Sequence, residues 1–309
     1  MSSPSIGIPA AHAPASAWQR VLQWGLFPLV LSVAGLASVA LYRGAVDPMA
    51  AQMGVFVLSL LAVVLAQRVL PFHLDWVSTS RQERRADISS WVVLMAAIDP
   101  LLKNGLMPAL MSLTVTLARP EGGLGWFPSG LAVPVQLLLA AAIAELGQYG
   151  MHRAAHGQGW LWSVHTMHHS PTRVSLSNGF RTNPINMVWH QMAGLFVLML
   201  IGTPAPVIQM LIVFSTVIGV FQHANADLRY AGWNWLLGTA DLHRWHHARQ
   251  AGDAHCNFGQ NLVLWDQVFG TYRRADAGAP SAVGIEGVNA PAQGYLAAVW
   301  RSSIGQLPR

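Results

Sequence analysis

Residues 21–42 read VLQWGLFPLVLSVAGLASVALY, a stretch without a single charged side chain. At 1.5 Å of rise per residue, a helix of this length spans about 30 Å, the thickness of the hydrocarbon core of a bilayer. Further along the chain, Pro48–Gln67 and Leu124–Ala144 are uncharged runs of similar length. The sequence therefore predicts an all-α protein with several membrane-spanning helices.

Two longer stretches extend this prediction. Thr182–Ala226 is uncharged and carries Pro204 and Pro206 near its middle. Because proline breaks helices, we expect a hairpin of two helices there. Ile88–Ala118 is apolar but interrupted around Asp99-Pro100, and either one long kinked helix or a half-span with an interfacial segment would fit. We favour a single crossing, which gives about four to six membrane segments in all.

The overall composition agrees with a membrane protein. The chain is 53% hydrophobic and 10% charged, whereas an average soluble domain has about 25% charged residues. The formal charge of +5 comes from scattered arginines between apolar runs, so we expect no nucleic-acid partner and assign these arginines to the cytoplasmic ends of membrane helices. The single cysteine, Cys256, cannot form an internal disulfide.

The charge pattern also predicts an orientation and a division of the chain. Arg68–Asp87 is rich in arginine, and the positive-inside rule places it in the cytoplasm. We expect a bacterial inner-membrane protein whose histidine-rich part forms a cytoplasmic helical cap. The predicted divisions are a disordered tail at 1–17, membrane helices at 18–120, a catalytic domain at 121–274 and a C-terminal tail at 275–309.

Histidines are concentrated in the second half of the chain. Ten of the thirteen lie between residues 152 and 247, and eight of these form three groups with the patterns H-x-x-x-H, H-x-x-H-H and H-x-x-H-H. Residues three or four apart share one face of an α-helix, so each group presents its rings together. The groups are His152/His156, His165/His168/His169 and His243/His246/His247.

The number and spacing of these histidines predict a site for two metal ions. Neutral imidazole binds iron, zinc, copper and nickel, and eight rings exceed what one four-coordinate ion needs. Adjacent rings in H-x-x-H-H point about 100° apart, so two rings of a triplet can bind one ion while the third reaches its neighbour. His223, at the end of the predicted hairpin, completes the expected ligand set. The nine expected ligands are His152, His156, His165, His168, His169, His223, His243, His246 and His247.

Other polar residues near these motifs have less defined roles. Glu145 and Asn225 are candidates to orient a ligand ring through its second nitrogen. For His190 and His255, structural roles are favoured over ligation. Arg153 occupies the position where a zinc protease with the pattern H-E-x-x-H has its glutamate base, so a zinc protease is excluded. We expect no catalytic residue beyond the metal ligands.

Three other classes of protein remain open from the residues alone. A membrane metal carrier would need ionisable residues along a path through the bilayer. A haem electron carrier with two histidine ligands needs only paired histidines on facing helices. A structural membrane protein could retain a site that no longer functions. None of these needs all three histidine groups.

At its histidine motifs the chain resembles the fatty acid hydroxylase/sterol desaturase superfamily of membrane di-iron proteins. The matching segments are HRAAH at 152–156, WSVHTMHHS at 162–170, FQHAN at 221–225 and DLHRWHH at 241–247. The ending with NFG at 257–259, LWD at 264–266 and FGT at 269–271 is similar to that of bacterial members. Together these segments cover roughly residues 143–272.

The resemblance implies an oxidoreductase that uses O₂ and two iron ions to attack an unactivated C–H bond of a lipid. Hydroxylation and desaturation are both compatible with it. It also implies a separate electron-transfer protein as donor. Many relatives carry R-x-H-P where this chain has Arg181-Thr182-Asn183-Pro184, so Asn183 replaces a histidine at a position expected near the metal ligands.

Overall fold

The computed structural model describes residues 15–117, 124–157, 159–285 and 294–306. Within these residues all regular secondary structure is helical, and the β-bridges are isolated pairs outside any strand. The prediction of an all-α protein is therefore confirmed. Most of the expected tail at 1–17 lies outside the described residues. The last residue of that range, Ala17, is the first residue of α1.

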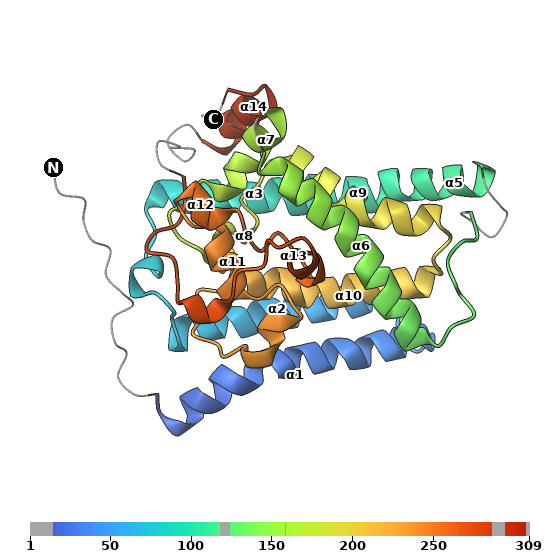
Figure 1. Ribbon diagram of the computed structural model, residues 1–309, viewed down its shortest axis with the longest axis horizontal. Helices are drawn as coiled ribbons and strands as arrows, with labels where there is room; N and C mark the ends of the chain where they lie inside the picture. The colour runs from blue at the N-terminus through green and yellow to red at the C-terminus, as the bar shows by residue number, and fades with distance from the viewer. Residues whose placement is uncertain (1–14, 118–123, 158, 286–293, 307–309) are drawn as a thin grey trace.

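Among the described residues, three helices are long and apolar enough to cross a membrane: α1 (Ala17–Tyr42), α2 (Pro48–Val69) and α10 (Ala205–Gln222). Local signals fix their starts. Ser16 and Gln19 form a capping box at α1, and Asp47 caps α2 ahead of Pro48 at its first position. The three helices pack against one another around a shared apolar core. They lie side by side along the length of the molecule (Figure 1).

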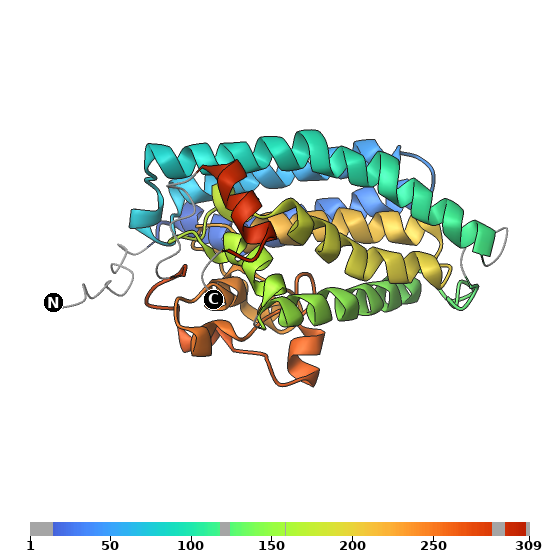
Figure 2. The same ribbon diagram turned by 90° about the horizontal axis from the view of Figure 1, so that it is seen from above.

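The stretch expected to be interrupted around Pro100 is one continuous helical run from Arg81 to Leu117. It consists of α3 (Arg81–Val93), the short α4 (Asp99–Leu101) and α5 (Met107–Leu117), joined by π-helical turns at Leu94–Ile98 and Leu102–Leu106. Proline cannot donate the N–H that an α-helix requires, and the wider turns on both sides take up this defect. Figure 2 shows the run along one side of the molecule.

The fourth predicted span begins later than expected. The helix α6 covers Val133–Ala155, whereas Leu124–Ala132 is not helical. In that segment the backbone N–H groups of Leu124 and Phe127 donate to the carbonyls of Leu200 and Ile201, at 2.7 and 2.9 Å. These bonds satisfy carbonyls at the end of α9 that have no partner within the helix.

The predicted hairpin is confirmed as α9 (Pro184–Leu200) and α10, with the turn at Thr203-Pro204. Two glycines allow α9 to cross α6 closely. A Cβ atom on Gly147 would lie 2.0 Å from the carbonyl oxygen of Ala193, and one on Gly194 would lie 2.9 Å from that of Ala144. The crossing brings α6, the helix with the first histidine pair, into firm contact with the hairpin.

The remaining short helices gather at one end of the bundle, where α1 begins and α2 and α10 end (Figure 1). They are α7 (Trp160–His169), α8 (Leu176–Gly179), α11 (Ala240–His246), α12 (Ala251–Ala254) and α13 (Leu264–Val268), with 3₁₀ turns at Leu74–Trp76, Ala231–Trp235 and Ala275–Ala277. We call this assembly the cap.

Part of the expected C-terminal tail is helical. Tyr295–Ser303 forms α14, which packs on α7 with Tyr295 and Ala298 buried. Asn183 donates hydrogen bonds from its amide nitrogen to the hydroxyl oxygens of Ser302 and Ser303, at 2.7 and 2.9 Å. The amphipathic spacing of this short helix was obscured by the Ala/Gly/Pro-rich segment before it.

Candidate metal centre

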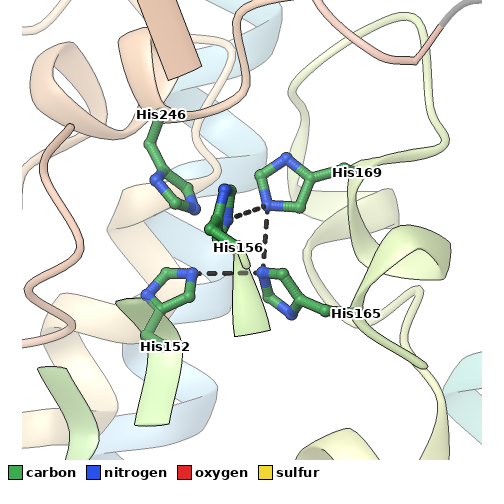
Figure 3. Close-up of side chains that lie close together, drawn as sticks. All are labelled: His152, His156, His165, His169 and His246. Atoms are coloured by element: carbon green, nitrogen blue, oxygen red, sulfur yellow. Dashed lines mark hydrogen bonds between the residues drawn. The ribbon is translucent and has the colours of Figure 1, made fainter. Parts of the chain in front are cut away.

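The nine histidines expected as ligands form two adjacent groups. Within each group, one nitrogen atom from every ring lies within 4.8 Å of the corresponding atoms of the others. Eight of the nine side chains are buried, and His168 is half-buried. The first group is His152, His156, His165, His169 and His246 (Figure 3). The second group is His168, His223, His243 and His247.

Each H-x-x-H-H triplet contributes to both groups. On α7, His165 and His169 belong to the first group and His168 to the second; on α11, His243 and His247 belong to the second and His246 to the first. The planes of the adjacent rings His168 and His169 are 90° apart, as are those of His246 and His247. The helical spacing thus divides each triplet two and one between the groups, as the sequence predicted.

The outer nitrogens of three rings in the first group are held by fixed acceptors. Nδ1 of His152 donates to the carbonyl of Phe258 at 2.7 Å, and Nδ1 of His246 donates to the carbonyl of Cys256 at 2.9 Å. Nδ1 of His165 donates to Oδ1 of Asn186 at 2.8 Å. A neutral imidazole carries only one N–H, so Nε2 of each of these three rings presents a lone pair.

These lone pairs face one another. Nε2 of His152 lies 3.1 Å from Nε2 of His165, and Nε2 of His246 has no partner among the described residues. Two lone pairs at that distance repel each other unless a proton or a cation lies between or beside them. In the second group Nε2 of His243 lies 2.9 Å from that of His223 and 3.0 Å from that of His247. The donor set therefore fits cations in both groups.

Burial keeps these rings neutral at physiological pH. Loss of hydration lowers the pKa of His168 to about 4. It also places the pKa of His165, His169 and His246 well below the usual value, and a proton on a neighbouring histidine would lower it further. A neutral imidazole is the form that binds a metal ion.

A short segment of the cap holds rings from two separate helices. The carbonyls of Cys256 and Phe258 accept from His246 on α11 and His152 on α6, respectively. Between them Asn257 adopts a left-handed backbone with φ of 53°, and its side chain donates to the carbonyls of Leu242 and Arg273. Asparagine tolerates this conformation better than most residues.

Asp266 holds the same segment through its backbone N–H groups. Its carboxylate accepts from the backbone N–H groups of Phe258 and Gly259, at 2.8 and 2.7 Å, and the side chain is fully buried. Sequence reasoning did not assign roles to these residues or to Asn186. For the segment around Asn257 and for Asp266, the sequence offered only the similarity of these short motifs to those of bacterial family members. For Asn186 it offered no indication.

The three residues expected to support the ligand rings have other partners. Glu145 accepts from the backbone N–H groups of Gln260 and Asn261, so it holds the loop beyond Phe258. Asn225 exchanges two hydrogen bonds with the backbone of His73. Asn183 binds α14, as described above. None of these hydrogen bonds reaches a ligand ring, because Glu145 and Asn225 face neighbouring backbone segments and Asn183 faces the serine hydroxyl groups of α14.

The two histidines left undecided lie at the edge of the first group. The ring centroid of His190 is 5.0 Å from that of His152, and that of His255 is 5.8 Å from that of His156. Neither ring belongs to the sets of nitrogens that converge. Their positions agree with the structural roles favoured from the sequence.

Buried ion pairs join the cap to α3. Asp87 accepts from Arg173 at 2.5 Å and from Nε of Arg181 at 2.7 Å, and Glu83 pairs with Arg173 as well. The backbone carbonyl of Arg181 in turn accepts a hydrogen bond from His168. The position of this ring therefore depends on the anchoring of Arg181 to α3.

The fold and the site together define an all-helical membrane protein with two adjacent histidine clusters. Residues 137–271 match the model of the fatty acid hydroxylase family. The chain is similar to the ornithine lipid hydroxylase OlsE of Rhizobium tropici, with 30% identity over 79% of this chain and 72% of that protein. It belongs to the fatty acid hydroxylase family and is an oxidoreductase.

More distant relatives match a smaller share of the chain. The alkylglycerol monooxygenase of Xenopus tropicalis is 28% identical over 41% of this chain and 28% of its own length. The human alkylglycerol monooxygenase is 26% identical over the same shares of the two chains. No solved structure matches this chain.

Proposed function

We propose that this protein hydroxylates a C–H bond of a membrane lipid with O₂, using two iron ions, one in each histidine group. The observation that carries the proposal is the convergence of lone pairs from neutral, buried rings in both groups. The overall reaction converts R–H, O₂, two electrons and two protons into R–OH and water. Bound iron would supply the activation of O₂ and the attack on the C–H bond.

The chain's own residues would hold and shield this chemistry. Four or five imidazoles per group provide the ligands, and the carbonyls of Cys256 and Phe258 with Asn186 fix the rings that face inward. Burial excludes water, which limits competing reactions. The chain holds no nucleotide-binding motif among its described residues, so a separate electron-transfer protein is part of the proposal.

Hydroxylation is favoured over desaturation because the relatives reported above are named as hydroxylases or monooxygenases. The cap lies at one end of the apolar helices, so an apolar chain could reach the site from the bilayer. We further propose that the protein resides in a bacterial inner membrane with the cap on the cytoplasmic side, which follows from the arginines of residues 68–87.

The proposal is tested by purifying the protein, measuring bound metals, and comparing lipid extracts from cells with and without it. We expect close to two irons per chain and a lipid heavier by one oxygen atom. A product lighter by two hydrogen atoms would instead establish desaturation. A Soret band would establish haem binding and overturn the di-iron site.

Ligand variants test the two groups separately. His246→Ala removes a ring of the first group and His168→Ala one of the second. We expect both to abolish the oxygenated product and to lower bound iron while the protein is still produced. Full activity of either variant would contradict the assignment of that histidine.

A further inference from the structure

A cavity of about 1200 Å³ lies next to the histidine groups within the cap. Its wall includes Asp241 and Arg244 of α11, the helix that carries three of the nine histidines, and Arg173, four residues after His169. It also includes Val283, whose neighbour Gly284 donates its N–H to the carbonyl of His247. The cavity therefore shares its wall with the segments that position the second group.

The cavity lies at the level where the membrane helices end. It is lined by Trp24 near the start of α1, by Trp76 shortly after the end of α2, and by Trp235. Trp24 and Trp235 are about half exposed, and tryptophan is enriched where a membrane meets water. A ligand in this cavity would have its polar part at the membrane surface and an apolar part directed to the bilayer.

The charges of the wall are almost completely paired within the chain. Four of its arginines form ion pairs: Arg173 with Glu83, Arg229 with Asp227, Arg244 with Asp241, and Arg274 with Asp276. One arginine and one aspartate are left. Arg249 makes no ion pair with any described residue, and Asp75 is exposed, with only His73 at 4.0 Å.

Several buried polar atoms of residues in the wall make no hydrogen bond to the described residues, and one of them is a neutral hydroxyl. Tyr230 is buried, and its hydroxyl makes no hydrogen bond to the described residues. A buried donor that is not paired costs about 1–3 kcal/mol, so a ligand with acceptor oxygens would relieve this cost. The wall thus offers a cation, an anion and a neutral donor.

We propose that this cavity binds the headgroup of the lipid substrate, and that this headgroup is zwitterionic, with an ammonium group and an oxyanion. Arg249 pairs with the oxyanion, since guanidinium binds carboxylate and phosphate equally well, and Asp75 pairs with the ammonium group. A purely anionic headgroup leaves Asp75 opposed by a like charge, which disfavours it. The inference rests on the proposed function, because it makes the bound lipid the substrate.

The test measures retention of lipids by the purified protein in detergent, with native mass spectrometry as the readout. The probes are phosphatidylethanolamine and an ornithine lipid, which carry the ammonium group with a phosphate or a carboxylate, and phosphatidylglycerol and diacylglycerol as anionic and neutral comparisons. We expect both zwitterionic lipids, or one of them, to be retained more than the comparisons. Whichever is retained more identifies the oxyanion.

Two variants connect retention to the cavity. Arg249→Gln and Asp75→Asn change exposed side chains, so both proteins should fold. We expect each to lower retention of the zwitterionic lipid roughly twofold to fivefold, the contribution of an exposed ion pair. Arg85→Gln, which alters an exposed arginine outside the cavity, should leave retention unchanged.

Equal retention of zwitterionic and anionic lipids, or retention unaffected by both cavity variants, would overturn the inference. Because binding is measured without turnover, the result is separate from the proposed function. A protein that retains the zwitterionic lipid but yields no oxygenated product keeps the headgroup site and loses the hydroxylase proposal. A protein that oxygenates lipids without any headgroup preference keeps the hydroxylase proposal and loses the headgroup site.

Discussion

Three of the five rings in the first group have their tautomer set by a hydrogen bond from the outer nitrogen. His152 and His246 donate to backbone carbonyls, while His165 donates to the side chain of Asn186. Only the last of these contacts can be removed by substitution without moving the main chain. Asn186 is therefore the residue at which the effect of orienting a ligand ring is most directly measured.

Asn186→Ala is expected to weaken metal binding without unfolding the protein. Without the acceptor, His165 can take either tautomer, and loss of such an outer contact typically lowers metal affinity about 10- to 100-fold. Competition with a chelator measures the affinity directly. Asn186→Asp keeps an acceptor at the same place and should restore most of it.

Asn183→Ala is the matched control for that experiment. Its amide binds Ser302 and Ser303 of α14 rather than a ring, so its loss should lower thermal stability and leave metal affinity unchanged. An Asn183→Ala variant with weaker metal binding than Asn186→Ala would show that the ring contacts described here are not the ones that matter.

The nine converging histidines could be predicted from the sequence because helical spacing alone divides each triplet between two directions. The residues that hold the rings in place could not be predicted from the sequence. Cys256 and Phe258 act through backbone carbonyls, which every residue has, and their placement depends on the left-handed turn at Asn257. Asn183 and Asn225 lie close to the motifs in sequence, yet Asn225 binds the backbone of His73 and Asn183 binds serine hydroxyl groups of α14.

Among the elements, α3 is attached to the cap by buried charge as well as by apolar packing, such as that of Trp91 on Phe180. Asp87 pairs with both Arg173 and Arg181 and is buried, as are both arginines. Removing one partner of a buried pair leaves an uncompensated charge, which typically costs about 3–5 kcal/mol. Because the carbonyl of Arg181 also accepts from His168, this element contact reaches the second histidine group.

Asp87→Ala is therefore expected to destabilise the protein by about 3–5 kcal/mol and to lower metal content. Thermal unfolding in detergent and metal analysis measure the two effects. Asp276→Ala removes an exposed ion pair with Arg274 and should change stability by less than about 1 kcal/mol. Similar losses for the two variants would argue against α3 being anchored by buried charge.

The boundaries of the elements were predicted unevenly. Uncharged runs located α1, α2 and the α9–α10 hairpin, because hydrophobicity decides membrane helices. The start of α6 at Val133 was missed, since Leu124–Ala132 is uncharged like the helix after it but closes the end of α9 with its backbone N–H groups. One long helix through Pro100 was one of the two alternatives that the sequence left open, because the π-helical turns that accommodate the proline have no distinct sequence pattern.

In the folded protein, four separate stretches of chain bring their histidines together: the end of α6, α7, the end of α10, and α11. Such a site does not exist in the unfolded chain, so metal binding and folding are coupled. Packing nine rings together is favourable only while they are neutral, because a proton on one ring repels a proton on the next. Acid should therefore act on folding and on metal binding in the same direction.

The metal-free protein is expected to lose stability as the pH falls from 6.5 towards 5. In the folded protein the pKa of His168 is about 4, against an ordinary value of 6.5, so the unfolded chain takes up protons first. The stabilisation is fully present above pH 6.5 and decreases as the pH falls towards the folded pKa. In the unfolded chain carboxylates have ordinary pKa values near 4 and remain mostly ionised above pH 5, so the protons that it takes up in this range go to histidine. Thermal unfolding at several pH values measures it, and the metal-loaded protein should release its ions over the same range. A metal-free protein equally stable at pH 7 and pH 5 would contradict the neutral, buried state of these rings.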